Sequence, residues 1–295
     1  MNFPVIQAPD TQLNLFYQKN DQDFILKLYG TNWNATEIFS MPTDLFESEM
    51  LNDKGVRNVL LDIQLDKVIF DVQNPIKKLT VSGQRLLKDW HFFHAQAELK
   101  DPLIFVFDEA SKQFKGAYKD LGNLMESFGF KTSISQGEVV LTLGQKESGE
   151  IQGRIYVESL HLKDPGFMTQ ALTILGIIDA FMGKDIVFDE VKIPVLIDLQ
   201  NQIFIQNGQA SGTNLGLTFK GKIFGNELDL QGSLVPAYAL NSLPGKIPLI
   251  GWFFKNTEGG GLINVPFSVK GTLGEPEVDF HLLKTMTPGF LGGLI

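Results

Sequence analysis

The chain has 295 residues, of which 43% are hydrophobic and 20% charged, with a net charge of −9 and no cysteine. This composition excludes a disordered chain, and the length fits one large domain or two moderate ones. The acidic balance, without clustered Lys and Arg, excludes a nucleic-acid binder, and the lack of cysteine excludes disulfides and thiolate sites.

Alternating apolar and polar residues, typical of strands, run through most of the sequence. The alternation includes residues 59–65, residues 139–157 on either side of a turn, and residues 195–199. Turn residues such as Asn207-Gly208 and Gly225-Asn226 separate these runs at short intervals. Strands joined by short loops predict an antiparallel sheet with one apolar face.

Two helices interrupt this pattern. The weaker one covers Lys119–Phe128. The stronger one covers Pro165–Met182, with Asp164 at the N-cap, Pro165 at the first helical position and Gly183 as a stop. The apolar run inside it is shorter than the ~20 residues that span a bilayer.

The last third has the cleanest alternation, and it predicts one apolar face shared by three strands. The residues on this face are Leu217, Phe219, Ile223, Leu228, Leu230, Leu234, Val265, Phe267 and Val269. Such a face must be covered, either by helices, loops or closure into a barrel or sandwich, or by a long apolar ligand in a partly open sheet. We therefore expect a mainly β fold: a long curved antiparallel sheet that forms a groove or partly open barrel, with two or three short capping helices.

No motif for catalysis or metal binding is found. His91 and His94 are three residues apart, which places them on opposite faces of a strand, and no carboxylate lies at metal-ligand spacing. No nucleophile elbow or phosphate loop is present, and acidic pairs such as Asp189-Glu190 fall at turns. We expect no enzymatic activity, no cofactor and no metal.

Phospholipid, or another lipid with acyl chains, is the partner that suits an open apolar face. Each methylene kept out of water contributes about 0.8 kcal/mol, so two chains of roughly sixteen carbons resist transfer through water by on the order of 25 kcal/mol. Two apolar segments, Ile247–Phe254 and Pro288–Ile295, are candidates for contact with an outer or inner membrane surface. The expected contact residues are Ile250, Trp252, Phe253, Phe254, Phe290 and Leu291.

A series of short motifs follows the stronger helix in a characteristic order. They are Ile186–Phe188, Phe204–Gly208, Thr213–Gly221, Leu228–Pro236, Asn241–Gly251, Gly259–Leu262, Phe267–Val278 and Pro288–Leu291. In order and spacing they resemble the C-terminal domain of AsmA-like proteins of the YhdP and TamB type, from about Leu160 to the C-terminus. The aromatic run at Trp252 departs from the aliphatic loop expected in this family.

The resemblance implies a taco-like groove that carries or guides phospholipid between the inner and outer membranes of bacteria. It also implies a periplasmic location, attached to the inner membrane through a segment absent from this chain. The expected organisation is an N-terminal β-rich groove segment over residues 1–160 and an AsmA-like C-terminal domain over residues 161–295. A non-enzymatic scaffold or assembly factor for outer-membrane biogenesis is the alternative function, and protein partners are not indicated.

Overall fold

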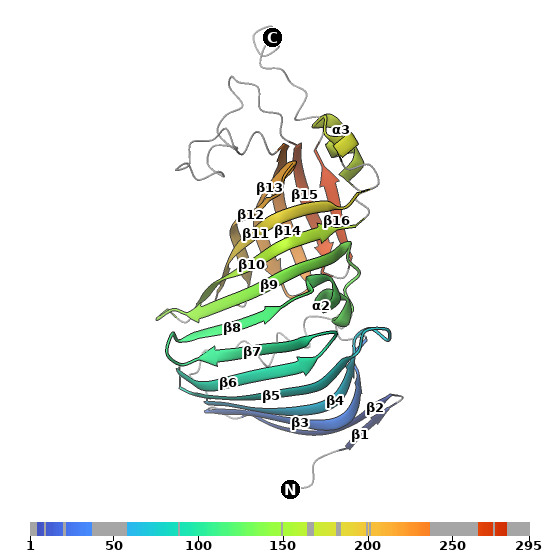
Figure 1. The fold of residues 1–295 in the computed structure, drawn as a ribbon. Helices are drawn as coiled ribbons and strands as arrows, with labels where there is room; N and C mark the ends of the chain where they lie inside the picture. The colour runs from blue at the N-terminus through green and yellow to red at the C-terminus, as the bar shows by residue number, and fades with distance from the viewer. Residues whose placement is uncertain are drawn as a thin grey trace.

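A computed structural model gives the fold of the chain (Figure 1). It describes residues 5–8, 10–19, 22–36, 58–87, 89–148, 150–163, 168–180, 184–198, 200, 202–236, 265–273 and 275–281. The strands are β1 (Val5–Ala8), β2 (Thr11–Lys19), β3 (Asp23–Asn34), β4 (Asn58–Ile69), β5 (Ile76–Leu86), β6 (Asp89–Glu98), β7 (Pro102–Asp108), β8 (Gln113–Tyr118), β9 (Ile134–Gln145), β10 (Ile151–Leu162), β11 (Ile186–Ile197), β12 (Ile203–Ser211), β13 (Leu215–Phe224), β14 (Glu227–Pro236), β15 (Val265–Thr272) and β16 (Pro276–Phe280). The helices are α2 (Leu121–Ser127), α3 (Thr169–Ile174) and the 3₁₀ helix η3 (Ile178–Ala180).

The sixteen strands of the described residues form one sheet in which the spatial order is the order along the chain, β1 to β16. The sheet is long, curved and not closed, which confirms the predicted fold class. One pair differs from the predicted antiparallel arrangement: β3 and β4 are parallel. A parallel pair needs a long connection rather than a tight turn, and residues 35–57 separate these two strands.

Helix α2 confirms the weaker helix prediction. The Asp120 side chain caps its N-terminus by accepting a hydrogen bond of 3.0 Å from the Asn123 backbone N–H. At the other end Gly129 has a φ of +80°, and the N–H groups of Gly129 and Phe130 donate to the carbonyls of Glu126 and Met125. This is the Schellman arrangement that ends a helix at a left-handed residue.

The prediction of one continuous helix over Pro165–Met182 is wrong for its central part. Helix α3 ends at Ile174, and η3 begins only at Ile178. The cause is Gly176, with a φ of +69° and an N–H that donates to the Thr173 carbonyl, while the Ile177 N–H donates to Leu172. Ile177 and Leu172 also share one apolar cluster, as is usual at a Schellman end. The predicted cap at Asp164 and stop at Gly183 lie outside the described residues.

The expected division between residues 160 and 161 falls inside β10, which pairs with both β9 and β11. Hydrogen bonding is therefore continuous across this position. The packing does form two clusters of buried side chains. One contains Leu13, Leu65 and Val68 of β2 and β4, and the other contains residues of β8–β15 together with α3.

The two ends of the strands differ in burial, and we name them accordingly. The closed rim is the side on which α2 and α3 connect the strands, and inward-facing apolar residues there are buried, including Val68, Ile186 and Leu215 at 0 to 1% exposure. The open rim is the opposite side, with the β5–β6, β7–β8, β9–β10, β11–β12 and β13–β14 turns. Inward-facing residues near the open rim, such as Leu143 and Ile223, are only half-buried.

Candidate functional site

The nine residues predicted to share an apolar face do lie on one face of β13, β14 and β15. Directly opposite residues in an antiparallel pair point to the same side of the sheet. Leu217 is opposite Leu234, which is opposite Val265, and Ile223 is opposite Leu228. Leu230 is opposite Val269, and Phe219 and Phe267 flank Gly232 between them.

These nine residues do not share one environment. Leu234, Val265 and Phe267 are buried in the cluster that includes α3, and Leu217, Phe219 and Val269 pack against it. Their side chains are therefore occupied by the protein's own core. Leu228 is 9% exposed, and Ile223 and Leu230, nearer the open rim, are half-buried. The part of this face that remains accessible to another molecule is the part toward the open rim.

An apolar row that crosses ten strands extends this face into the N-terminal half. Successive pairings join residues on one face of β2 to β11, each opposite the next. The members are Leu15, Leu28, Ile63, Val81, Ala95, Phe105, Gly116, Leu141, Ile155 and Ile193. At about 4.8 Å per strand, nine steps give a row of roughly 43 Å.

This row lies on the face of the curved sheet that carries the buried core, which we name the inner face. Val157, two residues from Ile155 of the row, and Phe267 of β15 belong to one cluster of buried side chains. Most members of the row, including Ile63, Phe105 and Leu141, are half-buried rather than buried. The inner face of the curved sheet therefore carries an apolar wall that the core covers only in part.

Five rings near the open rim, which we name the aromatic patch, were not predicted as site residues. The patch consists of Trp90, Phe93, Phe105, Phe107 and Phe114. Neighbouring centroids lie 5.1 to 5.8 Å apart, within the range of favourable ring contacts. A signal in the sequence could have identified the patch. Phe105 and Phe107 are two residues apart, as are Phe93, Ala95 and Ala97, and this spacing places each set on one face of a strand.

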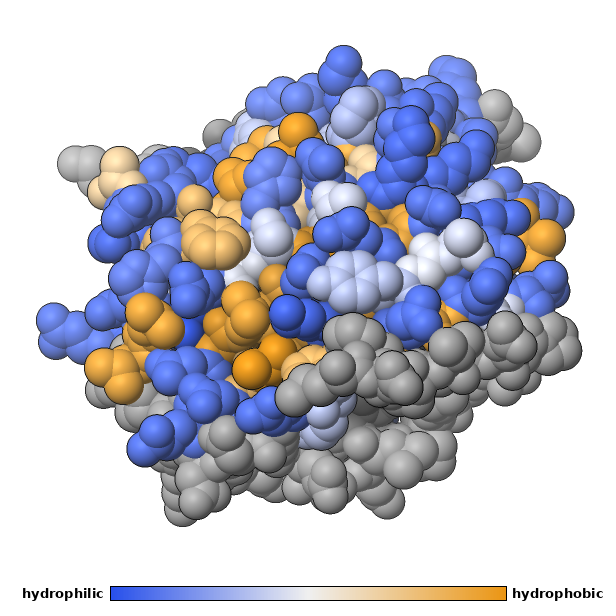
Figure 2. Space-filling model, turned by 90° about the horizontal axis from the view of Figure 1, so that it is seen from below, coloured by the Kyte–Doolittle hydropathy of each residue, from blue (hydrophilic) through white to orange (hydrophobic). Residues whose placement is uncertain are grey.

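Figure 2 shows the molecule from below, with the end formed by the first strands toward the viewer. Apolar side chains gather in patches between polar ones on this side. Exposed apolar residues of the open rim include Leu86 and Leu87, at 40% and 66% exposure. Leu87 has a φ of +56°, and its N–H donates to the Asn58 side chain.

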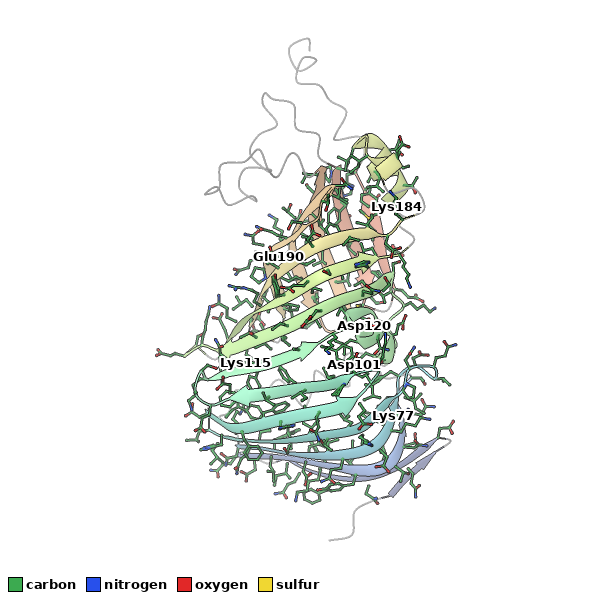
Figure 3. The ribbon with its side chains drawn as sticks, in the orientation of Figure 1. Lys77, Asp101, Lys115, Asp120, Lys184 and Glu190 are labelled. Carbon is green, nitrogen blue, oxygen red and sulfur yellow. The ribbon has the colours of Figure 1, made fainter. Side chains whose placement is uncertain are left out.

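The hollows at the closed rim are polar. One of about 380 Å³ is lined by Lys100, Asp101, Lys119 and Asp120 together with polar residues of β9 and β10. Asp101 and Asp120 lie beside α2, whereas Lys115 lies toward the open rim (Figure 3). The Lys100 ammonium is 3.0 Å from the Asp120 carboxylate, so these two charges of the hollow are paired within the protein.

Titratable groups in the described residues form pairs rather than a metal site, such as His161 with Asp185 and His281 with Asp279. No group of three or more His, Asp or Glu in that part of the chain could hold a metal ion, and His91 and His94 are exposed. The Asp62 carboxylate accepts a hydrogen bond from Tyr29 and raises the pKa of that phenol to about 12. The hydrogen bond from Lys115 lowers the pKa of Asp108 to about 2. Both shifts move the pKa of the group further from neutral pH.

The predicted membrane-contact residues, Ile250, Trp252, Phe253, Phe254, Phe290 and Leu291, lie outside the described residues. Within the described ranges, no helix is both long enough and apolar enough to cross a bilayer.

Comparison of the chain with protein-family models, curated proteins and solved structures finds no match.

Proposed function

We propose that the groove binds the acyl chains of phospholipid and carries or guides the lipid between the inner and outer membranes of a bacterial envelope. The observation that supports this most directly is the apolar row, which crosses ten strands on the inner face and is mostly half-buried. A core residue is normally covered by the rest of the chain, so a long half-covered apolar wall calls for another apolar molecule.

Hydrocarbon fits this wall better than a compact ligand. Small-molecule sites combine an apolar pocket with a few convergent polar groups. The row from Leu15 to Ile193 has no polar side chain, and it is far longer than a pocket. Shelter of two chains of about sixteen carbons offsets on the order of 25 kcal/mol of exposure to water, without any specific contact.

The difference between the rims supports an arrangement in which lipid enters from one side. Core packing with α2 and α3 fills the groove at the closed rim. Toward the open rim, the aromatic patch and residues such as Leu143 and Ile223 remain half-buried. In this proposal the tails lie between the two rims and the headgroup stays at the open rim, near water.

The proposal keeps the setting that the family resemblance implies. The protein acts in the periplasm as an AsmA-like, non-enzymatic lipid carrier, attached to the inner membrane. Its function then depends on the length and continuity of the wall rather than on any single reactive group.

Site-specific crosslinking in cells tests the proposal with neighbours on one strand as matched controls. A photoreactive phenylalanine analogue replaces Leu141 or Phe105, which face inward, or Val140 or Ile104, which face outward. The outward residues are 39% and 47% exposed, so nonspecific contact with lipid would label them at least as strongly. We expect phospholipid adducts at positions 141 and 105 and none at positions 140 and 104, read by mass spectrometry of the purified protein.

Equal labelling on both faces, or no adduct on either, would contradict the proposal. A protein partner recovered in stoichiometric amount without any lipid would instead support the scaffold function.

A further inference from the structure

One charged side chain interrupts the apolar inner face. Among the described inward-facing residues of β4 to β15 toward the open rim, Arg85 is the one with a charged side chain. It lies opposite Val59 on β4 and opposite Trp90 on β6. Two residues before it on the same face is Gly83, and then Val81 of the apolar row.

Arg85 lies at the border between the aromatic patch and the open rim. Its guanidinium carbon is 6.0 Å from the centre of the Trp90 ring, which in turn contacts Phe93 and Phe114. Gly83 leaves room for this ring, because a Cβ there would lie 3.1 Å from Trp90 Cζ3. The side chain is half-buried and belongs to the next-to-last residue of β5, beside the turn to β6.

A cation at this position is costly as a packing element. Burial lowers the pKa of the Arg85 guanidinium, which means that the surroundings disfavour its charge. An aliphatic residue would extend the wall without that cost. A guanidinium that lies beside hydrocarbon and close to water is suited to a ligand that has both an anionic group and an apolar part.

We propose that Arg85 binds the phosphodiester of a phospholipid whose acyl chains lie on the aromatic patch and the apolar row. Guanidinium matches phosphate oxygens in a bidentate geometry, and with five N–H donors it can do so while keeping a contact within the protein. This inference rests on the proposed lipid-binding function and adds the headgroup chemistry and its place on the open rim.

The phosphate group could belong to a free phosphate ion or to a phospholipid, and these two ligands would contact different parts of the site. A free phosphate ion would bind to Arg85 alone, whereas a phospholipid also needs the apolar wall. A lipid without phosphate, such as diacylglycerol, would bind the wall without Arg85. Binding of these three molecules to the same protein therefore separates the contributions of headgroup and tail.

The experiment measures equilibrium binding of fluorescent phosphatidylglycerol and of diacylglycerol with the same acyl chains to the full-length protein and to Arg85→Gln. Inorganic phosphate is tested for binding to the same proteins and as a competitor of each lipid. Arg154→Gln is the matched control, because Arg154 is exposed on the other face, opposite Thr142 and Pro194. We expect Arg85→Gln to weaken phosphatidylglycerol binding about tenfold, the loss of one charge-assisted contact, and to leave diacylglycerol unchanged. Arg154→Gln changes neither, and Arg85→Lys retains part of the preference.

Three results would contradict the inference. If both lipids bind and Arg85→Gln weakens neither, or weakens both equally, the groove takes lipid without a headgroup site at Arg85. If inorganic phosphate alone binds at Arg85 and displaces no lipid, the site is for free phosphate. If neither lipid binds the unaltered chain, the lipid function itself fails. Circular dichroism of Arg85→Lys and Arg85→Gln shows that each variant is folded before binding is compared.

Discussion

Two leucines on β14 provide a direct test of whether the groove is open. Leu230 and Leu234 are four residues apart on the same face of one strand, but Leu234 is 2% exposed and packs in the core cluster, whereas Leu230 is half-buried. Truncation of a buried leucine to alanine costs about 2 to 5 kcal/mol, because both transfer energy and a cavity are involved. Truncation of a half-buried leucine loses only part of the transfer energy, about 1 kcal/mol, and leaves no enclosed cavity.

The assay is thermal unfolding of Leu234→Ala and Leu230→Ala, followed by far-UV circular dichroism. At roughly 2 °C for each kcal/mol in a chain of this size, we expect Tm to fall by about 4 to 10 °C for Leu234→Ala and by about 2 °C for Leu230→Ala. Equal losses would mean that Leu230 is packed as tightly as Leu234. The groove would then be filled by the protein along its whole depth, and the argument for a lipid would be refuted.

Two further predictions concern a helix end and a carboxylate. Gly176→Ala should lower the free energy of unfolding by about 1 kcal/mol, because alanine disfavours the φ of +69° at this position. No atom lies within 4 Å of the added Cβ, so the effect comes from the backbone alone. Thermal unfolding measures it, and an unchanged Tm would argue against the left-handed turn. The pKa of Asp108 is lowered to about 2, first by the hydrogen bond from Lys115, so the ionised pair favours folding above pH 4 and this contribution is lost as the pH falls through about 2. NMR titration should show this pKa, and Lys115→Met should return it toward the usual range; an unshifted carboxyl in the unaltered protein would contradict the pairing.

Much of the sheet could be predicted because strand periodicity is a local signal. The alternation at Leu228 and Leu230 placed these side chains on one face, and the register with β13 and β15 bears this out. The parallel pairing of β3 with β4 could not be predicted in the same way, since it depends on which strands meet after a long connection. Gly176 is a residue type that often ends a helix, but the apolar residues that follow it favoured the prediction of one longer helix.

Part of the site could be recognised only from the three-dimensional structure. Sequence alone placed Leu234, Val265 and Phe267 on the apolar face but could not show that they belong to a buried cluster that includes residues of α3. A groove segment was predicted over residues 1–160, but no binding residue was named on the inner face of β4 to β11. Its members come from strands far apart in the chain, and only the successive pairings reveal that Ile63 and Ile193 belong to one row.

The sequential strand order has a consequence for how such a protein can change its size. In a closed barrel the number of strands and their stagger set the diameter together, so adding a strand alters the whole structure. Here each strand pairs only with its neighbours in the chain, as in a repeat protein, and stability accumulates between adjacent units. Duplication of one hairpin would lengthen the groove by about 10 Å and leave the other strands in place. The length of the groove can therefore change through small insertions while the fold is kept.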